Sequence, residues 1–161
     1  MRVLEETEMA KEMDLNQFPD VLQQISNRLN GNLEIALGLC GKKIQSDIGY
    51  NMAHTQRSDK GYHTQNKTKL HYPSLPFNPP AIDTDRLRQS IGYEVVNNGH
   101  EVYGMVGTSQ RDPDYGRWLE YGTTKMEPRP WLRPAMLENN EFIKKAISQA
   151  IKNTFTGETK W

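Results

Sequence analysis

The chain has 161 residues, a length typical of one domain with one core. Its 20 basic residues balance 20 acidic ones, which argues against a dedicated nucleic-acid-binding protein, because such proteins usually carry a basic excess. A hydrophobic fraction of 35% and a mean hydropathy of −0.80 are low for a compact monomer, so we expect segments that lie outside the core or are ordered by partners.

Cysteine content and hydropathy indicate the cellular compartment in which the protein folds. Cys40 is the only cysteine, so an intrachain disulfide is excluded, and folding in a reducing cytosol fits. No apolar run approaches the ~20 residues that span a bilayer. Acidic residues stand at the N-terminus, where a signal peptide would be basic. We therefore expect no contact with a membrane and no export by a signal peptide.

The first part of the chain predicts an acidic segment and then one long helix. We expect residues 1–17 to be flexible, and residues 1–20 carry a net charge of −4. Over about residues 19–53, apolar side chains recur every three or four positions, which is the period of one helix face. The stripe consists of Leu22, Ile25, Leu29, Leu33, Ala36, Cys40, Ile44 and Ile48. On this stripe, Cys40 is expected to be a small buried residue.

Residues 54–80 predict a long loop that is polar first and proline-rich later. Long connections without structure are usually functional or disordered. The stretch 54–72 has a net charge of +3 and forms a candidate contact with a partner or with DNA. Its basic residues are Arg57, Lys60, Lys67 and Lys69. The alternative, that this stretch and the acidic segment are simply solvated, stays open.

The next residues predict a short helix and a hairpin. Asp83 and Thr84 are helix-capping types and precede a short helix over residues 85–90. The dipeptide Asn98-Gly99 favours a two-residue turn between two antiparallel strands.

The last part predicts a strand and a helix. Tyr115–Tyr121 is expected to be a third strand, and Pro134 suits the first turn of a helix that reaches about residue 154. The result is one α+β domain over residues 18–155, followed by a tail over 156–161. It combines a small antiparallel β-sheet, one long N-terminal helix and a C-terminal helix, with a long loop between the first helix and the sheet.

The sequence offers no catalytic or metal-binding spacing. The histidines His54, His63, His71 and His100 do not stand three or four positions apart, and most lie in the basic loop, where we expect them to face solvent or a partner. We expect no cofactor and no metal. Two interpretations of Glu120 stay open: an ion pair with Arg129 or Arg133 within the chain, or an ion pair across subunits.

Residues 115–137, YGRWLEYGTTKMEPRPWLRPAML, are the most distinctive stretch. They contain three arginines, two tryptophans and three prolines. Aromatic residues interleaved with arginine are typical of protein interfaces. Stacking of nucleic-acid bases on Trp118, Tyr121 and Trp131 is the alternative, and it ranks lower because the chain has no basic excess.

This stretch resembles the signature of the head–tail joining family of long-tailed double-stranded DNA phages and prophages, whose members are neck or tail-completion proteins. Residues 83–91, DTDRLRQSI, are similar to the short segment that precedes the hairpin of that family, which often has glycine at the position of Asp85. The resemblance covers roughly residues 20–152.

The resemblance implies a structural virion protein of the tail or neck, made in the cytoplasm of the host bacterium, without catalysis or cofactor. Implied partners are the tail terminator, the tail tube and the head-closure or connector proteins. A homo-oligomeric ring is also implied, with six copies expected, and a monomeric free protein is compatible with it. Proximity to DNA is implied only as non-specific. The alternatives are a tail terminator or other minor tail protein and, more distantly, a small nucleic-acid-binding or hydrolytic protein.

Ten positions make up the candidate interface and structural motif. The resemblance implies that Gly122 supplies a special backbone conformation and that Pro130 and Pro134 restrict the entry into the helix. It implies that Trp131 packs this helix against the sheet. It also allows an ion pair between Glu120 and Arg133. The positions are Trp118, Glu120, Tyr121, Gly122, Thr123, Arg129, Pro130, Trp131, Arg133 and Pro134.

Overall fold

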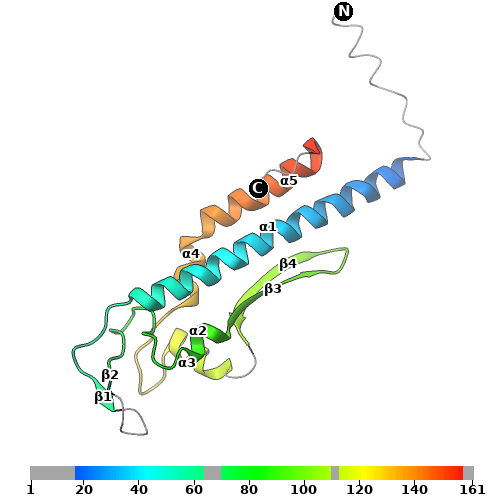
Figure 1. Cartoon of the computed structure of the whole chain (residues 1–161). Coiled ribbons are helices and arrows are strands. Elements are labelled where there is room, and N and C mark those ends of the chain that lie inside the picture. Colours follow the sequence, from blue (N-terminus) through cyan, green and yellow to red (C-terminus); the bar gives the residue numbers. More distant parts are fainter. Residues whose placement is uncertain (1–16, 64–69, 110–112, 158–161) are drawn as a thin grey trace, which may run out of the picture.

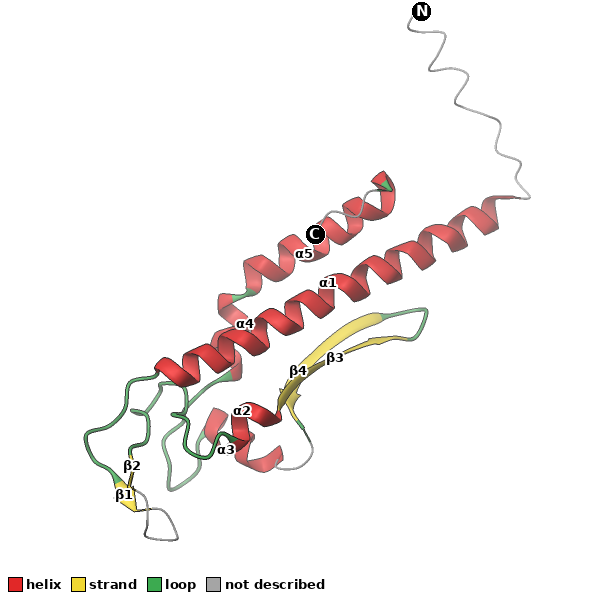
Figure 2. Ribbon diagram, in the orientation of Figure 1, coloured by secondary structure: helices red, strands yellow, loops and turns green. Residues whose placement is uncertain are grey.

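The computed structural model describes residues 17–63, 70–109 and 113–157. Figures 1 and 2 show an α+β arrangement in which one long helix lies between a shorter helix and a β-hairpin. Residues 1–16 of the acidic N-terminal segment, residues 158–161 of the C-terminal tail, and Lys67 and Lys69 of the basic loop lie outside the described residues.

The long helix α1 spans Phe18–His54 and confirms the prediction from the apolar stripe. Pro19 stands in its first turn, where the missing backbone N–H costs nothing. The stripe is not buried along its whole length: Leu22 is exposed, whereas Cys40 and Ile48 are buried. Burial raises the pKa of the Cys40 thiol, as expected of a thiol in apolar surroundings. The C-terminal half of α1 therefore supplies one side of the core.

The β-hairpin consists of β3 (Ile91–Asn97) and β4 (Val102–Thr108), paired antiparallel. Its loop has four residues, 98–101, so the predicted two-residue turn is wrong. The reason lies in Asn98, whose side-chain oxygen accepts hydrogen bonds from the backbone N–H groups of His100 (3.0 Å) and Glu101 (2.8 Å). These bonds give backbone N–H groups of the four-residue loop a partner. Gly99 takes a positive φ of 85° within the loop.

The segment 54–80 is less irregular than predicted. It contains a second small sheet, formed by the antiparallel strands β1 (Tyr62–His63) and β2 (Leu70–His71). Next to this pair along the chain, the backbone N–H of Ser58 donates to the carbonyl of Pro73 at 2.7 Å. We call residues 55–75, as far as they are described, the arm.

The predicted third strand is wrong, because Tyr115–Tyr121 belongs to helix α3 (Pro113–Tyr121). Pro113 stands at the helix start, and Asp114 lies in the first turn, where an acid interacts favourably with the helix dipole. The helical period buries Gly116 and Leu119 together. Among the described residues, both sheets are therefore two-stranded.

The predicted C-terminal helix is two helices, α4 (Leu132–Glu138) and α5 (Asn140–Thr156). Asn139 between them is 3% exposed. Its side-chain amide donates to Asp47 Oδ2 on α1 at 2.8 Å and to the carbonyl of Ala135 at 2.9 Å. Pro134 lies in the first turn of α4, as predicted. The junction between α4 and α5 therefore holds the buried Asn139 in contact with α1.

The core lies where α1, α3, α4 and the start of β3 meet. Its buried members come from these elements and pack into one apolar cluster. They are Ile44, Ile48, Met52, Ile91, Leu119, Trp131 and Ala135. In the part of the chain that the structure describes, no helix combines the length and the apolar character that crossing a bilayer requires.

Candidate functional site

Trp131 fastens α3 to the start of α4. Its side chain is 5% exposed, and the indole N–H donates to the carbonyl of Gly116 at 2.9 Å. A Cβ atom at Gly116 would stand 3.0 Å from Thr108 Cγ2 and 3.4 Å from the Trp131 ring. A Cβ here would therefore crowd the Thr108 and Trp131 side chains, and glycine allows the α3 backbone to approach them closely. Trp131 was expected to pack its helix against the sheet; it lies in the apolar core cluster, to which the sheet contributes Ile91, and its polar contact is with α3.

Glu120 caps α4 from a distance. Its Oε2 accepts the backbone N–H groups of Trp131 (2.7 Å) and Leu132 (2.9 Å), and its Oε1 accepts that of Arg133 (3.0 Å). These are first-turn donors that have no partner inside the helix, and a negative charge is favoured at that end. Within the chain the carboxylate binds backbone N–H groups, among them that of Arg133, in place of the predicted ion pair with the Arg129 or Arg133 side chain. An ion pair of Glu120 across subunits stays a prediction.

Arg129 connects the same corner to the arm. Its backbone N–H donates to the carbonyl of Leu119 at 2.7 Å, and its guanidinium donates to the carbonyls of Ser74 (3.2 Å) and Glu127 (3.3 Å). The residue thus holds the arm, α3 and the segment before α4 together, which gives it a structural part in the motif.

Gly122 ends α3 in a left-handed conformation, with φ of 75°. Its N–H donates to the carbonyl of Trp118 at 2.8 Å, as in a common helix-ending motif. A Cβ atom there would stand 2.8 Å from the carbonyl oxygen of Met126. The special backbone conformation expected of Gly122 is confirmed. Thr123 then pairs with Met126 through two backbone hydrogen bonds, which turns the chain back toward Pro130.

The outer side of this corner carries aromatic and cationic side chains. Trp118 is 51% exposed, Tyr121 is 65% exposed, and Arg117 and Arg133 are exposed as well. The Arg133 guanidinium carbon lies 5.6 Å from the centre of the Tyr121 ring, within the range of a cation–π contact. We call these four residues the Arg–Trp surface. Arg117 was not among the predicted site residues, and the helical period of α3 places it on the same side of the helix as Tyr121, four positions later.

The candidate contact loop divides. Arg57 donates to the carbonyls of Tyr72 (3.4 Å) and Ile82 (3.2 Å), so its guanidinium holds the arm to the segment before α2 (Arg86–Ser90). Lys60 is exposed on the arm. Arg57 is exposed as well, and a role of the loop in partner contact stays a prediction for Arg57, Lys60, Lys67 and Lys69.

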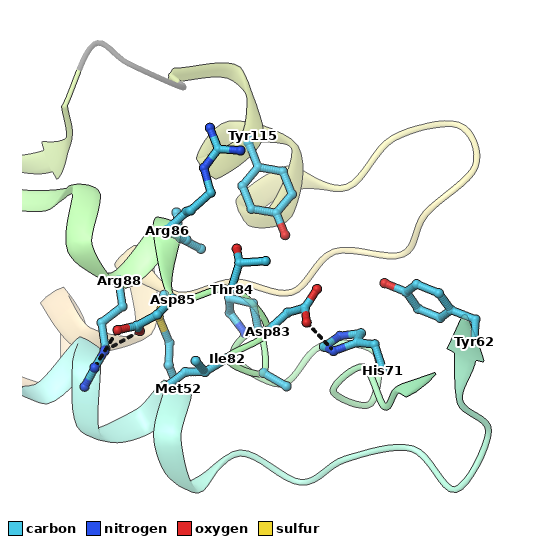
Figure 3. A pocket seen from close by; sticks show the side chains of 13 residues that line it. Met52, Tyr62, His71, Ile82, Asp83, Thr84, Asp85, Arg86, Arg88 and Tyr115 are labelled. Atoms are coloured by element: carbon cyan, nitrogen blue, oxygen red, sulfur yellow. Dashed lines mark hydrogen bonds and ion pairs between the residues drawn. The ribbon is translucent and has the colours of Figure 1, made fainter. Parts of the chain in front are cut away.

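A pocket of about 250 Å³ lies between the arm, α2 and α3 (Figure 3). His71 is 8% exposed there, and its Nδ1 lies 3.3 Å from Asp83 Oδ1, so the expected solvent-facing position of this histidine is wrong. Tyr62 and Tyr115 come from opposite sides of the pocket (Figure 3). The His71–Asp83 pair connects β2 to the segment before α2. The described residues contain no group of three or more His, Cys, Asp or Glu side chains arranged to hold a metal ion.

The start of α2 differs from the predicted cap. Asp85, and neither Asp83 nor Thr84, occupies the capping position, and no side chain caps the helix. Asp85 has a left-handed φ of 62°, a conformation that glycine adopts most easily. The Arg88 guanidinium donates to both of its carboxylate oxygens, at 2.6 and 2.7 Å, and holds the pKa of Asp85 below its usual value.

Comparison of the chain with protein-family models, with curated proteins and with solved structures finds no match.

Proposed function

We propose that the protein is a structural virion protein at the head–tail interface of long-tailed double-stranded DNA phages or prophages. There it completes the tail, joins it to the DNA-filled head, or does both, as part of a ring-like assembly. The family part of the proposal rests on the resemblance of residues 115–137. The observation that carries the mechanism is the Arg–Trp surface, which stands on a corner held by Glu120, Trp131 and Gly122.

Rigid support makes this surface suitable for binding. Tryptophan, tyrosine and arginine are the residues that most often dominate the energy of protein interfaces. Because backbone hydrogen bonds fix the corner, the backbone that carries Trp118 and Tyr121 loses little conformational freedom on binding, so more of the contact energy appears as affinity. The proposed partners are neighbouring neck and tail proteins and further copies of this chain, with six copies expected in the ring.

The exposed apolar side chains fit a protein that works within an assembly. Apart from the Arg–Trp surface, large apolar residues are exposed along α1, α4 and α5, for example Leu22, Leu137 and Phe155. Where exposed apolar side chains gather into large patches, they mark contact sites in soluble proteins. A position as tail terminator or other minor tail protein would use the same surfaces, because the fold does not determine the place in the particle.

Binding to isolated tails tests the proposal. Purified protein is added to tails that lack it, and the bound fraction is measured by co-sedimentation. We expect wild-type protein to bind, Trp118→Ala to bind at least about tenfold more weakly, and the exposed control Lys42→Ala to bind normally. Equal binding of all three proteins would remove the Arg–Trp surface from the joining role. Binding to DNA with a steep salt dependence, in place of binding to tails, would favour the nucleic-acid alternative.

A further inference from the structure

The Arg–Trp surface brings two cations to one aromatic side chain. Arg117 stands four positions before Tyr121 on α3, a spacing at which side chains are neighbours on a helix. The Arg133 guanidinium lies over the same ring, and Trp118 stands three positions before it on α3. The hydrogen bonds of the corner hold α3 and the start of α4 together. The surface thus presents guanidinium groups and exposed rings on a rigid backbone.

Both cations lack an acidic partner within the part of the chain that the structure describes. Neither Arg117 nor Arg133 forms an ion pair there. Glu120, which lies between them in the sequence, already accepts three backbone N–H groups. Guanidinium groups bind carboxylates through two parallel hydrogen bonds, and they also stack on aromatic rings. The surface is therefore suited to an acidic segment that also carries apolar side chains.

The acidic N-terminal segment, residues 1–17, has this composition. It contains five acidic residues and two basic ones. Glu8 and Glu12 stand four positions apart, and each is followed directly by a methionine, Met9 and Met13. The thioether of methionine makes favourable contacts with aromatic rings. The charge and the side-chain chemistry of residues 8–13 therefore complement the Arg–Trp surface, and such complementarity selects partners and their orientation.

The length of α1 prevents this contact within one copy. The acidic segment leads into α1 at Phe18, whereas α3 lies at the opposite end of that helix (Figure 1). Leu119 of α3 shares the core cluster with the C-terminal half of α1, whose member nearest to Phe18 is Ile44. At the rise of an α-helix, Phe18 and Ile44 are about 40 Å apart. Even a fully extended chain carries Glu12 only about 21 Å and Glu8 only about 35 Å from Phe18. Residues 8–13 therefore reach the surface of another copy and not their own.

We propose that residues 8–13 of one copy dock on the Arg–Trp surface of a neighbouring copy. The carboxylates of Glu8 and Glu12 pair with the two guanidinium groups, and the methionines that follow them lie on the exposed rings. Because the contact joins two different surfaces, it is head-to-tail, and repeated head-to-tail contacts close into rings when the rotation permits. Ordering the segment has an entropic cost, so a single contact is weak, and a closed ring gains affinity because every copy makes two such contacts.

This contact rests on the proposed function and deepens it, since it specifies how copies build the ring. A fluorescent peptide of residues 1–17 tests it on the intact chain, with fluorescence anisotropy giving the Kd. The peptide is titrated with the wild type, with Arg117→Glu, and with the double variant Arg117→Glu/Arg133→Glu. Both arginines are exposed, so these variants retain the core, which circular dichroism checks. Lys42→Glu, an exposed charge reversal on α1, is the matched control.

We expect the wild type and Lys42→Glu to bind the peptide equally, with an affinity that falls as salt is raised from about 0.05 to 0.5 M. Arg117→Glu is expected to bind at least about tenfold more weakly, because one cation becomes an acid. If the double variant does not fold, Arg117→Glu alone decides. A wild type that does not bind the peptide, or equal binding by the wild type and Arg117→Glu, would overturn the contact.

Two changed peptides separate the docked residues from net charge. One carries Glu8→Lys/Glu12→Lys, and its control carries Glu5→Lys/Glu6→Lys, which has the same net charge. We expect the first to bind the wild type more weakly than the control does, and to bind the double protein variant more tightly than the unchanged peptide does. An equal loss with both changed peptides would overturn the assignment of residues 8–13.

The outcome can be separated from that of the proposed function. If Trp118→Ala fails to bind tails while the peptide binds the wild type and Arg117→Glu equally, the Arg–Trp surface binds another tail or neck protein, and the segment contact is wrong while the joining role stands. If peptide binding follows the charge pattern but the wild type does not bind tails, the segment contact stands and the joining role is wrong. Loss of peptide binding in Lys60→Glu, with normal binding in Arg117→Glu, would move the contact to the arm and overturn the proposal.

Discussion

The carboxylate of Glu120 shows how one side chain positions two helices. Its three hydrogen bonds join the end of α3 to backbone N–H groups eleven to thirteen residues further along the chain. These donors would otherwise lack a partner inside α4, since the N-terminal side of that helix carries no side-chain cap of its own. The orientation of Trp118 and Tyr121 relative to Arg133 therefore depends on an acid that itself faces inward.

The first prediction concerns removal of the Glu120 carboxylate. Glu120→Ala is expected to lower the free energy of unfolding by about 1–3 kcal/mol, because it removes a charged cap from three backbone donors. Glu120→Gln keeps an acceptor oxygen and is expected to lose less. Urea unfolding followed by circular dichroism measures both, with the exposed Glu127→Ala as control. Equal stability of Glu120→Ala and Glu127→Ala would contradict the capping role.

Gly122 and Gly38 make a matched pair for the second prediction. Gly122→Ala forces a Cβ into a left-handed residue and against the Met126 carbonyl, so we expect a loss of at least about 1–2 kcal/mol. Gly38 lies inside α1, and a Cβ added there would meet no neighbouring atom within 4 Å, so Gly38→Ala is expected to gain about 0.4–1 kcal/mol. Thermal unfolding is therefore expected to show that the same change from glycine to alanine destabilises the protein at Gly122 and stabilises it at Gly38. A stabilising Gly122→Ala would refute the assignment.

At the scale of elements, long periodic patterns were predictable and short elements were not. The stripe on α1 runs over most of that helix and gives its bounds to within a residue. By contrast, the strand predicted at Tyr115–Tyr121 rested on a short aromatic-rich run, and aromatic residues have a high β-propensity. Tertiary packing overrides that preference, because the helical period lets Leu119 enter the core while Gly116 lies against Thr108 and Trp131.

Contacts between distant residues explain the other differences. Asn139 stands at the junction of α4 and α5, where its amide binds Asp47 on α1, and the buried His71 lies beside Asp83 of another segment. Neither partner is visible from local sequence. Of the predicted motif, the special roles of Gly122, Trp131 and Pro134 followed from residue type, whereas the partner of Glu120 required the fold.

The Asn139 junction gives a prediction for pH. Burial raises the pKa of Asp47, but hydrogen bonds from Lys43 and Asn139 outweigh it and leave the pKa below its usual value. A lowered folded-state pKa stabilises the fold above the unfolded value of about 3.9, and this contribution disappears as pH falls through the folded value. Asp47→Asn is therefore expected to weaken the dependence of unfolding free energy on pH between about pH 5 and 2. Asp59→Asn, an exposed arm residue, serves as control. A slope unchanged by Asp47→Asn would contradict the assignment.

At the scale of the whole molecule, the fold leaves large surfaces without a partner inside the chain. One core supports α1, while the Arg–Trp surface and the outer faces of α1 and α5 remain exposed among the described residues. Covering these surfaces would need several neighbours at once. Assembly would then wait until a platform such as a completed tail end supplies them, which orders the steps of particle construction.

Electron microscopy of particles made without this protein tests the joining role most directly. The expected result is DNA-filled heads and separate tails that fail to join, and joined particles after purified wild-type protein is added. Normal joined particles in the absence of the protein would contradict the account.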